Sequence, residues 1–157
     1  MDNTEASFEN KSDLDKYGGW LRFFRLINAM YWMVGLFGLI SFPLLIFVGF
    51  ENNQEFIDFF AVFIEVLPGT IMSFLIWRTV LVHKPETPNK VYSLLKFDLA
   101  LQLLVGAGLY FAYKQDFITE KPVSFLISVI YYFIWAAYFK RSKRVLACYG
   151  TNAAKTS

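Results

Sequence analysis

The sequence has few of the residues that metal and redox sites require. Its 157 residues include one cysteine, Cys148, and one histidine, His83. A single cysteine excludes an internal disulfide and a CxxC pair, and no set of metal ligands accompanies His83. The sequence also has no phosphate-binding glycine loop, no HExxH and no serine elbow with a histidine partner. We therefore expect no metal, no cofactor and no enzymatic activity.

Charge is also scarce. Charged residues make up 18% of the chain, against about 25% in soluble domains, whereas 56% of the residues are hydrophobic and the mean hydropathy is +0.41. Residues 26–50 contain no Asp, Glu, Lys or Arg. About 20 apolar residues cross a ~30 Å hydrocarbon core, so this run predicts a membrane-spanning helix. Residues 1–16 lack the apolar core of a cleavable signal peptide, and we expect the first span to direct insertion.

Three further apolar runs follow the first. They predict an all-α fold, an integral membrane four-helix bundle, with helices at about 26–50, 56–82, 91–113 and 122–139. We expect residues 1–16 to be a disordered polar lead-in, residues 17–150 to form one transmembrane domain, and residues 151–157 to fray. Pro43 is expected to kink the first helix, Pro122 fits the first turn of the fourth, and Gly150 is a natural helix stop.

Both flanks of the bundle combine aromatic and basic residues. Before the first span, Arg22 and Arg25 share a helical face next to Trp20, which predicts a short interfacial helix in the headgroup layer or a simple lead into the span. After the fourth span, a basic segment is expected to continue the helix into the cytoplasm and to attract anionic lipid. The predicted lipid anchors are Trp20, Arg22, Arg25, Lys140, Arg141, Lys143 and Arg144.

The distribution of basic residues predicts the orientation. The first loop, residues 51–55, contains no Lys or Arg, and the third contains only Lys114 and Lys121. The two flanks and the second loop carry most of the others. The positive-inside rule therefore predicts that both termini lie in the cytoplasm.

Of the polar residues within the predicted spans, three are candidates for function. At 1.5 Å per residue, Glu65, Asp98 and Gln102 come to similar depths near the midplane. An ionisable group there costs roughly 2.5–3.5 kcal/mol. One hypothesis is a polar site between the second and third helices that holds a proton or a cation. The alternative is that each carboxyl is protonated or hydrogen-bonded and only fixes helix packing.

Small residues recur on the first predicted helix. Gly35, Gly38 and Ser41 follow one another at intervals of three, and small residues at such spacing allow close helix–helix approach within a membrane. We therefore predict that this strip is a helix-packing surface, either within the chain or against a partner.

Two segments at opposite ends of the chain resemble a known family. Gly18-Gly19-Trp20-Leu21 precedes the first span, and Tyr138-Phe139-Lys140-Arg141-Ser142-Lys143-Arg144-Val145 follows the fourth. Together they resemble the YdgK-like family, small bacterial inner-membrane proteins with four predicted helices that are classed as a domain of unknown function. The resemblance covers about residues 17–149. It implies a multi-pass protein of the bacterial inner membrane and brings no catalytic residue.

Three functional hypotheses follow. The first is a non-enzymatic accessory or scaffold subunit that acts through lipid and helix–helix contacts, with another membrane protein or a second copy of the chain as partner and no nucleic acid. The second is a small proton- or cation-coupled transporter that uses Glu65 and Asp98. The third, protection against a membrane-acting toxin, is compatible with the size and topology alone.

Overall fold

The structure is a computed structural model that describes residues 19–50 and 52–153. Within these residues the fold is all-helical, with five helices and no strand, which confirms the predicted class. The lead-in of residues 1–16 and residues 154–157 of the expected tail lie outside the described residues. The helices are α2 (Trp20–Val48), α3 (Asn53–Val80), α4 (Thr87–Lys114), α5 (Ser124–Arg141) and α6 (Lys143–Tyr149).

Three of these helices are long and apolar enough to cross a membrane. They are α2, α3 and α4, with 28 or 29 residues each and a mean hydropathy of 1.5 to 2.1 over their most apolar windows. Helix α5 has 18 residues and does not meet the same combined criteria of length, mean hydropathy and low charge. The membrane-spanning character of three helices agrees with the sequence analysis, and the count of four spans stays a prediction.

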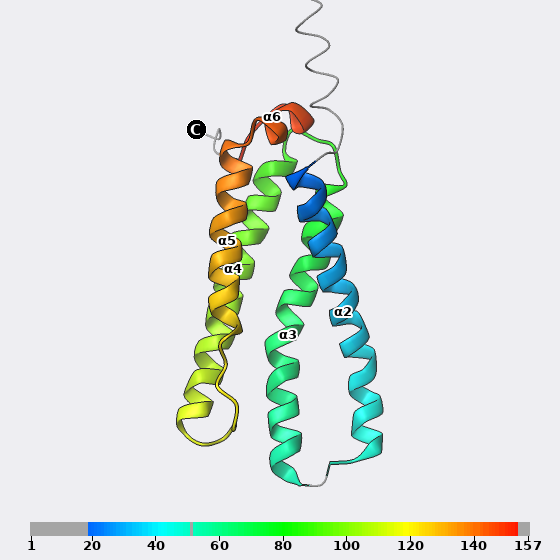
Figure 1. Ribbon diagram of the computed structural model, residues 1–157, viewed down its shortest axis with the longest axis vertical. Coiled ribbons are helices and arrows are strands. Elements are labelled where there is room, and N and C mark those ends of the chain that lie inside the picture. The colour runs from blue at the N-terminus through cyan, green and yellow to red at the C-terminus, as the bar shows by residue number, and fades with distance from the viewer. Residues whose placement is uncertain (1–18, 51, 154–157) are drawn as a thin grey trace, which may run out of the picture.

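The long helices lie side by side as two hairpins (Figure 1). Helix α2 packs on α3, and α4 packs on both α3 and α5. The short connections after α2 and after α4 lie at one end, which we call the loop end. Helix α6 lies across the opposite end and contacts α4 and α5.

Helices α3 and α4 begin earlier than the sequence predicted. Asn52 caps α3, because its side chain accepts a hydrogen bond from the Glu55 N–H at 2.9 Å and donates one to the Glu55 carboxylate at 2.9 Å, a reciprocal arrangement that stabilises the first turn. Helix α4 begins at Thr87 with Pro88 in its first turn, where the missing N–H of proline costs nothing. Pro88 therefore starts a helix in a segment that was expected to be a loop.

The N-terminal interfacial helix is not separate in the described residues. From Trp20 onward the segment is continuous with α2, which also runs through Pro43 as one helix. Its aromatic residues explain the difference, because Phe24 is fully buried. The centroid of the Phe24 ring lies 4.4 Å from the ring centroid of Trp135 and 5.1 Å from that of Phe139. This face packs on α5 and is not available to the headgroup layer.

The predicted extension of the fourth helix is interrupted. Helix α5 ends at Arg141, and Ser142 adopts an extended conformation (φ −72°, ψ 124°) in which its hydroxyl caps α6 by accepting from the N–H groups of Arg144 and Val145. Val145 and Tyr149 are buried, one turn apart, and the Tyr149 hydroxyl donates to the Val80 carbonyl at 2.9 Å. Helix α6 therefore covers the end of the bundle because one of its faces is apolar.

The chain after α6 returns to the bundle. Gly150 ends the helix in the left-handed region (φ 75°) and donates to the Leu146 carbonyl at 2.7 Å, as predicted for a stop. Thr151 then bonds the Pro85 carbonyl at 2.5 Å, and the Ala153 N–H bonds the Phe139 carbonyl at 3.1 Å. Residues 151–153 therefore contact the bundle through these two bonds, and the fraying expected for residues 151–157 stays a prediction.

The two segments that carry the family resemblance lie against each other. Gly19 has φ +66°, and a Cβ atom on it would come within 2.1 Å of the Arg144 guanidinium. Leu21 and Val145, from the same two segments, both belong to the buried core at this end. These motifs are thus far apart in sequence but adjacent in the fold.

Apolar side chains form two separate clusters. The larger one lies near α6 and includes Phe24, Ile76, Leu95 and Phe139. The smaller one lies toward the loop end, around Ala61, Leu109 and Ile118. On each long helix, the residues between the two clusters include polar side chains, which line the cavity described below.

The glycine strip of α2 is only partly a packing surface within the chain. Gly35 is buried, and a Cβ atom on it would come within 1.9 Å of Thr70 Oγ1 on α3. Gly38 is exposed and has nothing within 4 Å of its ideal Cβ position. Ser41 bonds the Phe37 carbonyl of its own helix at 2.8 Å. Close approach of α2 and α3 therefore depends on Gly35.

We expect Gly35→Ala to destabilise the protein, because the added methyl group forces α2 away from Thr70. Overpacking of this kind costs about 1–3 kcal/mol. Gly38→Ala is the matched control and should leave the free energy of unfolding unchanged or slightly raised, since alanine favours a helix more than glycine does. Unfolding in mixed micelles measures both variants, and equal stabilities for the two would contradict the α2–α3 contact.

Candidate functional site

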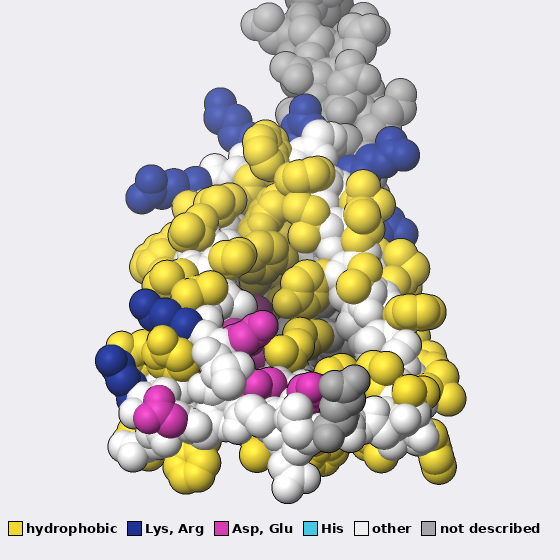
Figure 2. Space-filling view, turned by 60° about the horizontal axis from the view of Figure 1, so that its bottom comes forward, with side chains coloured by type: hydrophobic (Ala, Val, Ile, Leu, Met, Phe, Trp, Pro, Cys, Tyr) yellow, Lys and Arg dark blue, Asp and Glu magenta, His cyan; other side chains and the backbone are white. Residues whose placement is uncertain are grey.

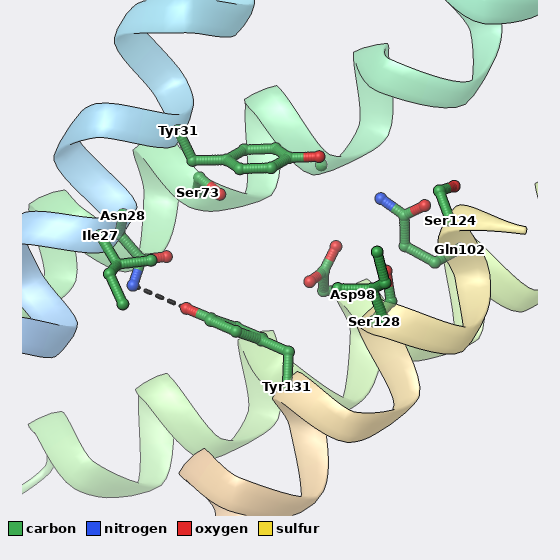
Figure 3. A pocket seen from close by; sticks show the side chains of 11 residues that line it. Ile27, Asn28, Tyr31, Ser73, Asp98, Gln102, Ser124, Ser128 and Tyr131 are labelled. Carbon is green, nitrogen blue, oxygen red and sulfur yellow. Dashed lines mark hydrogen bonds between the residues drawn. The ribbon is translucent and has the colours of Figure 1, made fainter.

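A cavity of about 300 Å³ lies between the two apolar clusters (Figure 3). All four long helices contribute to its wall, which is lined by eight polar side chains, two isoleucines and one glycine. The polar lining residues are Asn28 and Tyr31 from α2, Ser73 from α3, Asp98 and Gln102 from α4, and Ser124, Ser128 and Tyr131 from α5.

The spacing of these residues explains why they meet. Asp98 and Gln102 are one turn apart on α4 and therefore share a face. Ser124, Ser128 and Tyr131 follow one another at intervals of four and three on α5 and likewise share a face. The cavity forms where these two faces oppose each other across the bundle.

Glycine makes room for the cavity on α3. A Cβ atom at Gly69 would come within 2.8 Å of Gln102 Nε2 and 3.1 Å of Tyr31 Cε1. Any larger residue at this position would therefore displace two side chains of the wall. Gly69 follows Pro68, and both residues are buried within α3.

Hydrogen bonds hold one side of the cavity wall. Asn28, only 1% exposed, donates from Nδ2 to the Phe24 carbonyl at 2.8 Å and to the Tyr131 hydroxyl at 2.7 Å. The second bond links α2 to α5. Both amide protons are thereby used, which leaves the Asn28 carbonyl oxygen as an acceptor.

Two buried oxygen atoms of the wall are unpaired within the described part of the chain. They are Asn28 Oδ1 and Asp98 Oδ1, neither of which has a hydrogen-bond partner among residues 19–50 and 52–153. Buried polar atoms are nearly always paired, so two unpaired acceptors on one cavity point to a donor that the cavity would receive. The cavity therefore has the chemistry of a site for a hydrogen-bond donor or a cation.

The cavity is lined by one acidic residue and by no basic one. Asp98 is the one charged side chain among its lining residues, and no Lys or Arg belongs to that lining. Lys96, two residues earlier on α4, lies over the Tyr92 ring instead, with its Nζ 4.4 Å from the ring centroid. Within the described residues, the one ion pair joins Lys90 to Glu86, in the first turn of α4 and outside the cavity.

Glu65 is adjacent to this cavity but does not line it. It accepts a hydrogen bond from the Ser124 hydroxyl, and Ser124 does line the cavity. Glu65 itself faces a second, smaller hollow of about 40 Å³, together with Asp58, Glu120 and Lys121. The structure thus brings Asp98 and Gln102 together as the sequence suggested, and it connects Glu65 to them through one serine.

The second hollow lies toward the loop end, and three of the four charged residues that line it are acidic. Asp58 is held there by two hydrogen bonds from Thr119, one from its N–H at 2.9 Å and one from its hydroxyl at 2.6 Å. Figure 2 shows acidic side chains gathered around a hollow at this end of the molecule. The carboxyl groups of Asp58, Glu65 and Glu120 therefore lie around this hollow, and that of Asp98 lies in the larger cavity.

The predicted lipid anchors lie at the opposite end, beside α6 and the beginning of α2. Trp20 is 61% exposed, and Arg22, Lys143 and Arg144 are also exposed. Lys140 Nζ lies 4.6 Å from the centroid of the Tyr92 ring. Lys140 and Arg141 are exposed on the last turn of α5, and Arg25 is half-buried on α2.

Sequence reasoning missed most of the cavity wall. Asn28, Tyr31 and Tyr131 lie within runs that the sequence analysis predicts as apolar spans, although a buried asparagine within a span is costly enough to be a signal. The serines of α5 recur at helical intervals, which was a second available signal. Gly69 carried no signal, because its role depends on the side chains of other helices.

No protein-family model matches the chain, and no curated protein or solved structure matches it either. The resemblance of the two end segments to the YdgK-like family therefore stays a prediction. Function has to be argued from the geometry of the cavity.

We expect Tyr131→Phe to weaken the link between α2 and α5, because Asn28 loses the acceptor of one hydrogen bond. Interhelical hydrogen bonds in membranes contribute on average about 0.6 kcal/mol and at most about 1.7, so the free energy of unfolding should fall by about that amount. The measurement is unfolding in mixed micelles. Tyr110→Phe, on α4 outside the cavity lining, is the control, and an equal loss in both variants would contradict a specific role for the Tyr131 hydroxyl.

Proposed function

We propose that the protein is a four-span membrane carrier that binds a small cation at Asp98 near the middle of the bilayer. The observation that carries the proposal is the cavity itself: it is a partly open pocket between the four long helices, lined by the acidic residue Asp98 and by no Lys or Arg. Ionisable groups at membrane depth mark substrate or ion pathways, and carriers bind their substrates near the midplane. This is the transporter hypothesis of the sequence analysis, with Asp98 as its main residue.

A membrane environment is supported by the outer surface of the helices. Large apolar side chains are exposed along the full length of α2, including Val34 at 72%, Phe37 at 74% and Phe47 at 88%. A continuous exposed apolar surface of this kind is unfavourable in water. Helix α5 also exposes Ile127 and Phe133, which supports its assignment as the fourth span.

The orientation follows from the charges at the two ends. Basic residues cluster at the end where α6 lies, and the connection between α2 and α3 has no Lys or Arg. The positive-inside rule then places the α6 end and both termini on the cytoplasmic side. A bacterial inner membrane would suit this arrangement and the resemblance of the end segments.

The acidic series at the loop end supports cation entry. Asp58, Glu65 and Glu120 line the second hollow together with one basic residue, Lys121. Glu65 accepts a hydrogen bond from Ser124, which lines the Asp98 cavity. Clefts lined by one sign of charge raise the local concentration of the opposite ion. Cations arriving on the non-cytoplasmic side would therefore meet a favourable path to Asp98.

An accessory role is the second candidate, and the exposed Gly38 favours it. Gly38 lines a shallow hollow of about 110 Å³ between α2 and α3, together with Gly35 and Phe42. A helix of another membrane protein, or of a second copy, fits such a surface without displacing any side chain. Loss of co-purification with a membrane partner in Gly38→Leu, with Asp98→Asn unaffected, would favour this role over transport.

The carrier predicts that Asp98→Asn abolishes cation-dependent flux. The wild-type protein and the variant are reconstituted in vesicles of phosphatidylethanolamine and phosphatidylglycerol, and a pH-sensitive dye reports proton movement when Na⁺, K⁺ or an organic cation is added outside. We expect at least a 10-fold loss of flux, because the variant keeps the shape of the side chain but not its charge. Asp116→Asn, in the connection between α4 and α5, removes the same charge outside the cavity and should behave as wild type. Undiminished flux in Asp98→Asn would contradict the proposal.

A further inference from the structure

Two aromatic rings border the part of the cavity into which Asp98 points. Figure 3 shows Tyr31 on one side of the Asp98 carboxylate and Tyr131 on the other. Both tyrosines line the same cavity as Asp98. Tyr31 comes from α2, Asp98 from α4 and Tyr131 from α5. The three helices therefore form a pocket lined by two aromatic rings and one carboxyl group.

The donor set does not suit a divalent metal ion. Within the described residues, no group of three His, Cys, Asp or Glu side chains lies close enough to hold a metal. Ca²⁺ and Mg²⁺ bind six or more oxygen ligands, commonly from several carboxylates. One carboxylate and two aromatic rings match a different class of cation.

We propose that the Asp98 cavity binds a small organic ammonium ion, with its charge next to the Asp98 carboxylate and its alkyl groups against the rings of Tyr31 and Tyr131. This inference rests on the proposed function and names the class of its substrate. Aromatic rings attract cations at their faces, and they recognise ammonium groups in this way when the site is shielded from water. The carboxylate balances the charge, which a ring alone does not do.

The remaining polar groups of the cavity suit the same ligand. Asn28 Oδ1 and Asp98 Oδ1 are buried acceptors without partners in the described part of the chain. A primary, secondary or tertiary ammonium group would donate an N–H bond to Asp98 Oδ1, and a hydroxyl on its alkyl chain would donate to Asn28 Oδ1. A quaternary ammonium such as choline has no N–H, so it would meet the carboxylate through its charge and would donate only from its hydroxyl. Ser73 and Ser128 are on the same wall and can accept or donate as needed.

The volume limits the size of the ligand. At about 300 Å³, the cavity is at the low end of the range for small-molecule sites. A compact ammonium compound with a few carbon atoms fits this space, and a large polycyclic cation does not. Affinity should therefore fall as the alkyl groups become larger than ethyl.

The test compares choline with 3,3-dimethylbutan-1-ol, which has the same shape but no charge. Binding to the full-length protein in detergent is measured by isothermal titration. We expect choline to bind at least 10-fold more tightly than the neutral compound. Asp98→Asn should remove this preference, whereas Asp116→Asn should keep it. Equal affinity for the two compounds would overturn the inference.

A second pair of variants tests the aromatic contribution. Tyr31→Leu removes the ring and should weaken choline binding by about 3- to 30-fold, the range expected for a cation–π contact. Tyr31→Phe keeps the ring and should bind as wild type does. Circular dichroism and gel filtration confirm that both variants fold. Unchanged binding in Tyr31→Leu would overturn the role of the ring.

The same experiments separate this inference from the proposed function. If choline does not bind but an inorganic cation drives proton flux that depends on Asp98, the carrier stands and the ammonium inference fails. If no cation binds or moves and Asp98→Asn resembles wild type, both fail. If choline binds and its binding depends on Asp98 and on the Tyr31 ring, both are supported.

Discussion

The packing of Phe24 against Trp135 and Phe139 is the contact on which the rest of the arrangement depends. These rings join the start of α2 to the end of α5, two elements that are far apart in sequence. Helix α6 covers the same cluster, with Val145 and Tyr149 buried in it. Because this end of the bundle is closed by apolar side chains, the polar residues one to two turns deeper are kept away from that surface and face one another.

The all-helical class and the long apolar helices could be predicted because they are typical of chains in a hydrocarbon environment. Hydrocarbon requires long uninterrupted apolar helices, and those runs are plain in the sequence. The exact ends were not accessible, since they depend on local bonds such as the Asn52 cap and the first-turn position of Pro88. The separate interfacial helix and the straight C-terminal extension were expected from local sequence, whereas the structure differs because tertiary packing buries Phe24 and Tyr149.

Part of the candidate site could be predicted from the sequence and part could not, for a physical reason. Asp98 and Gln102 lie on one helix, so their common face follows from a spacing of four. Glu65 lies on another helix, and its rotation about that axis is set by contacts that no single sequence reveals. It faces Ser124 and the second hollow instead. Depth along a helix could therefore be estimated from residue counts, whereas direction around the helix could not.

The two ends of the bundle differ in a way that bears on transport. The α6 end is sealed by aromatic rings, while carboxyl groups surround a hollow at the loop end. A carrier must expose its site alternately to each side, and the structure would correspond to the state that faces the loop end. In the proposed carrier, opening the other side would require α2 to separate from α5, which would break the Phe24–Trp135 contact and the bond between Asn28 and Tyr131. Since Asn28 and Tyr131 also line the cavity, a ligand that pairs with them would alter the stability of the closed state, and binding would be coupled to the motion through these two residues.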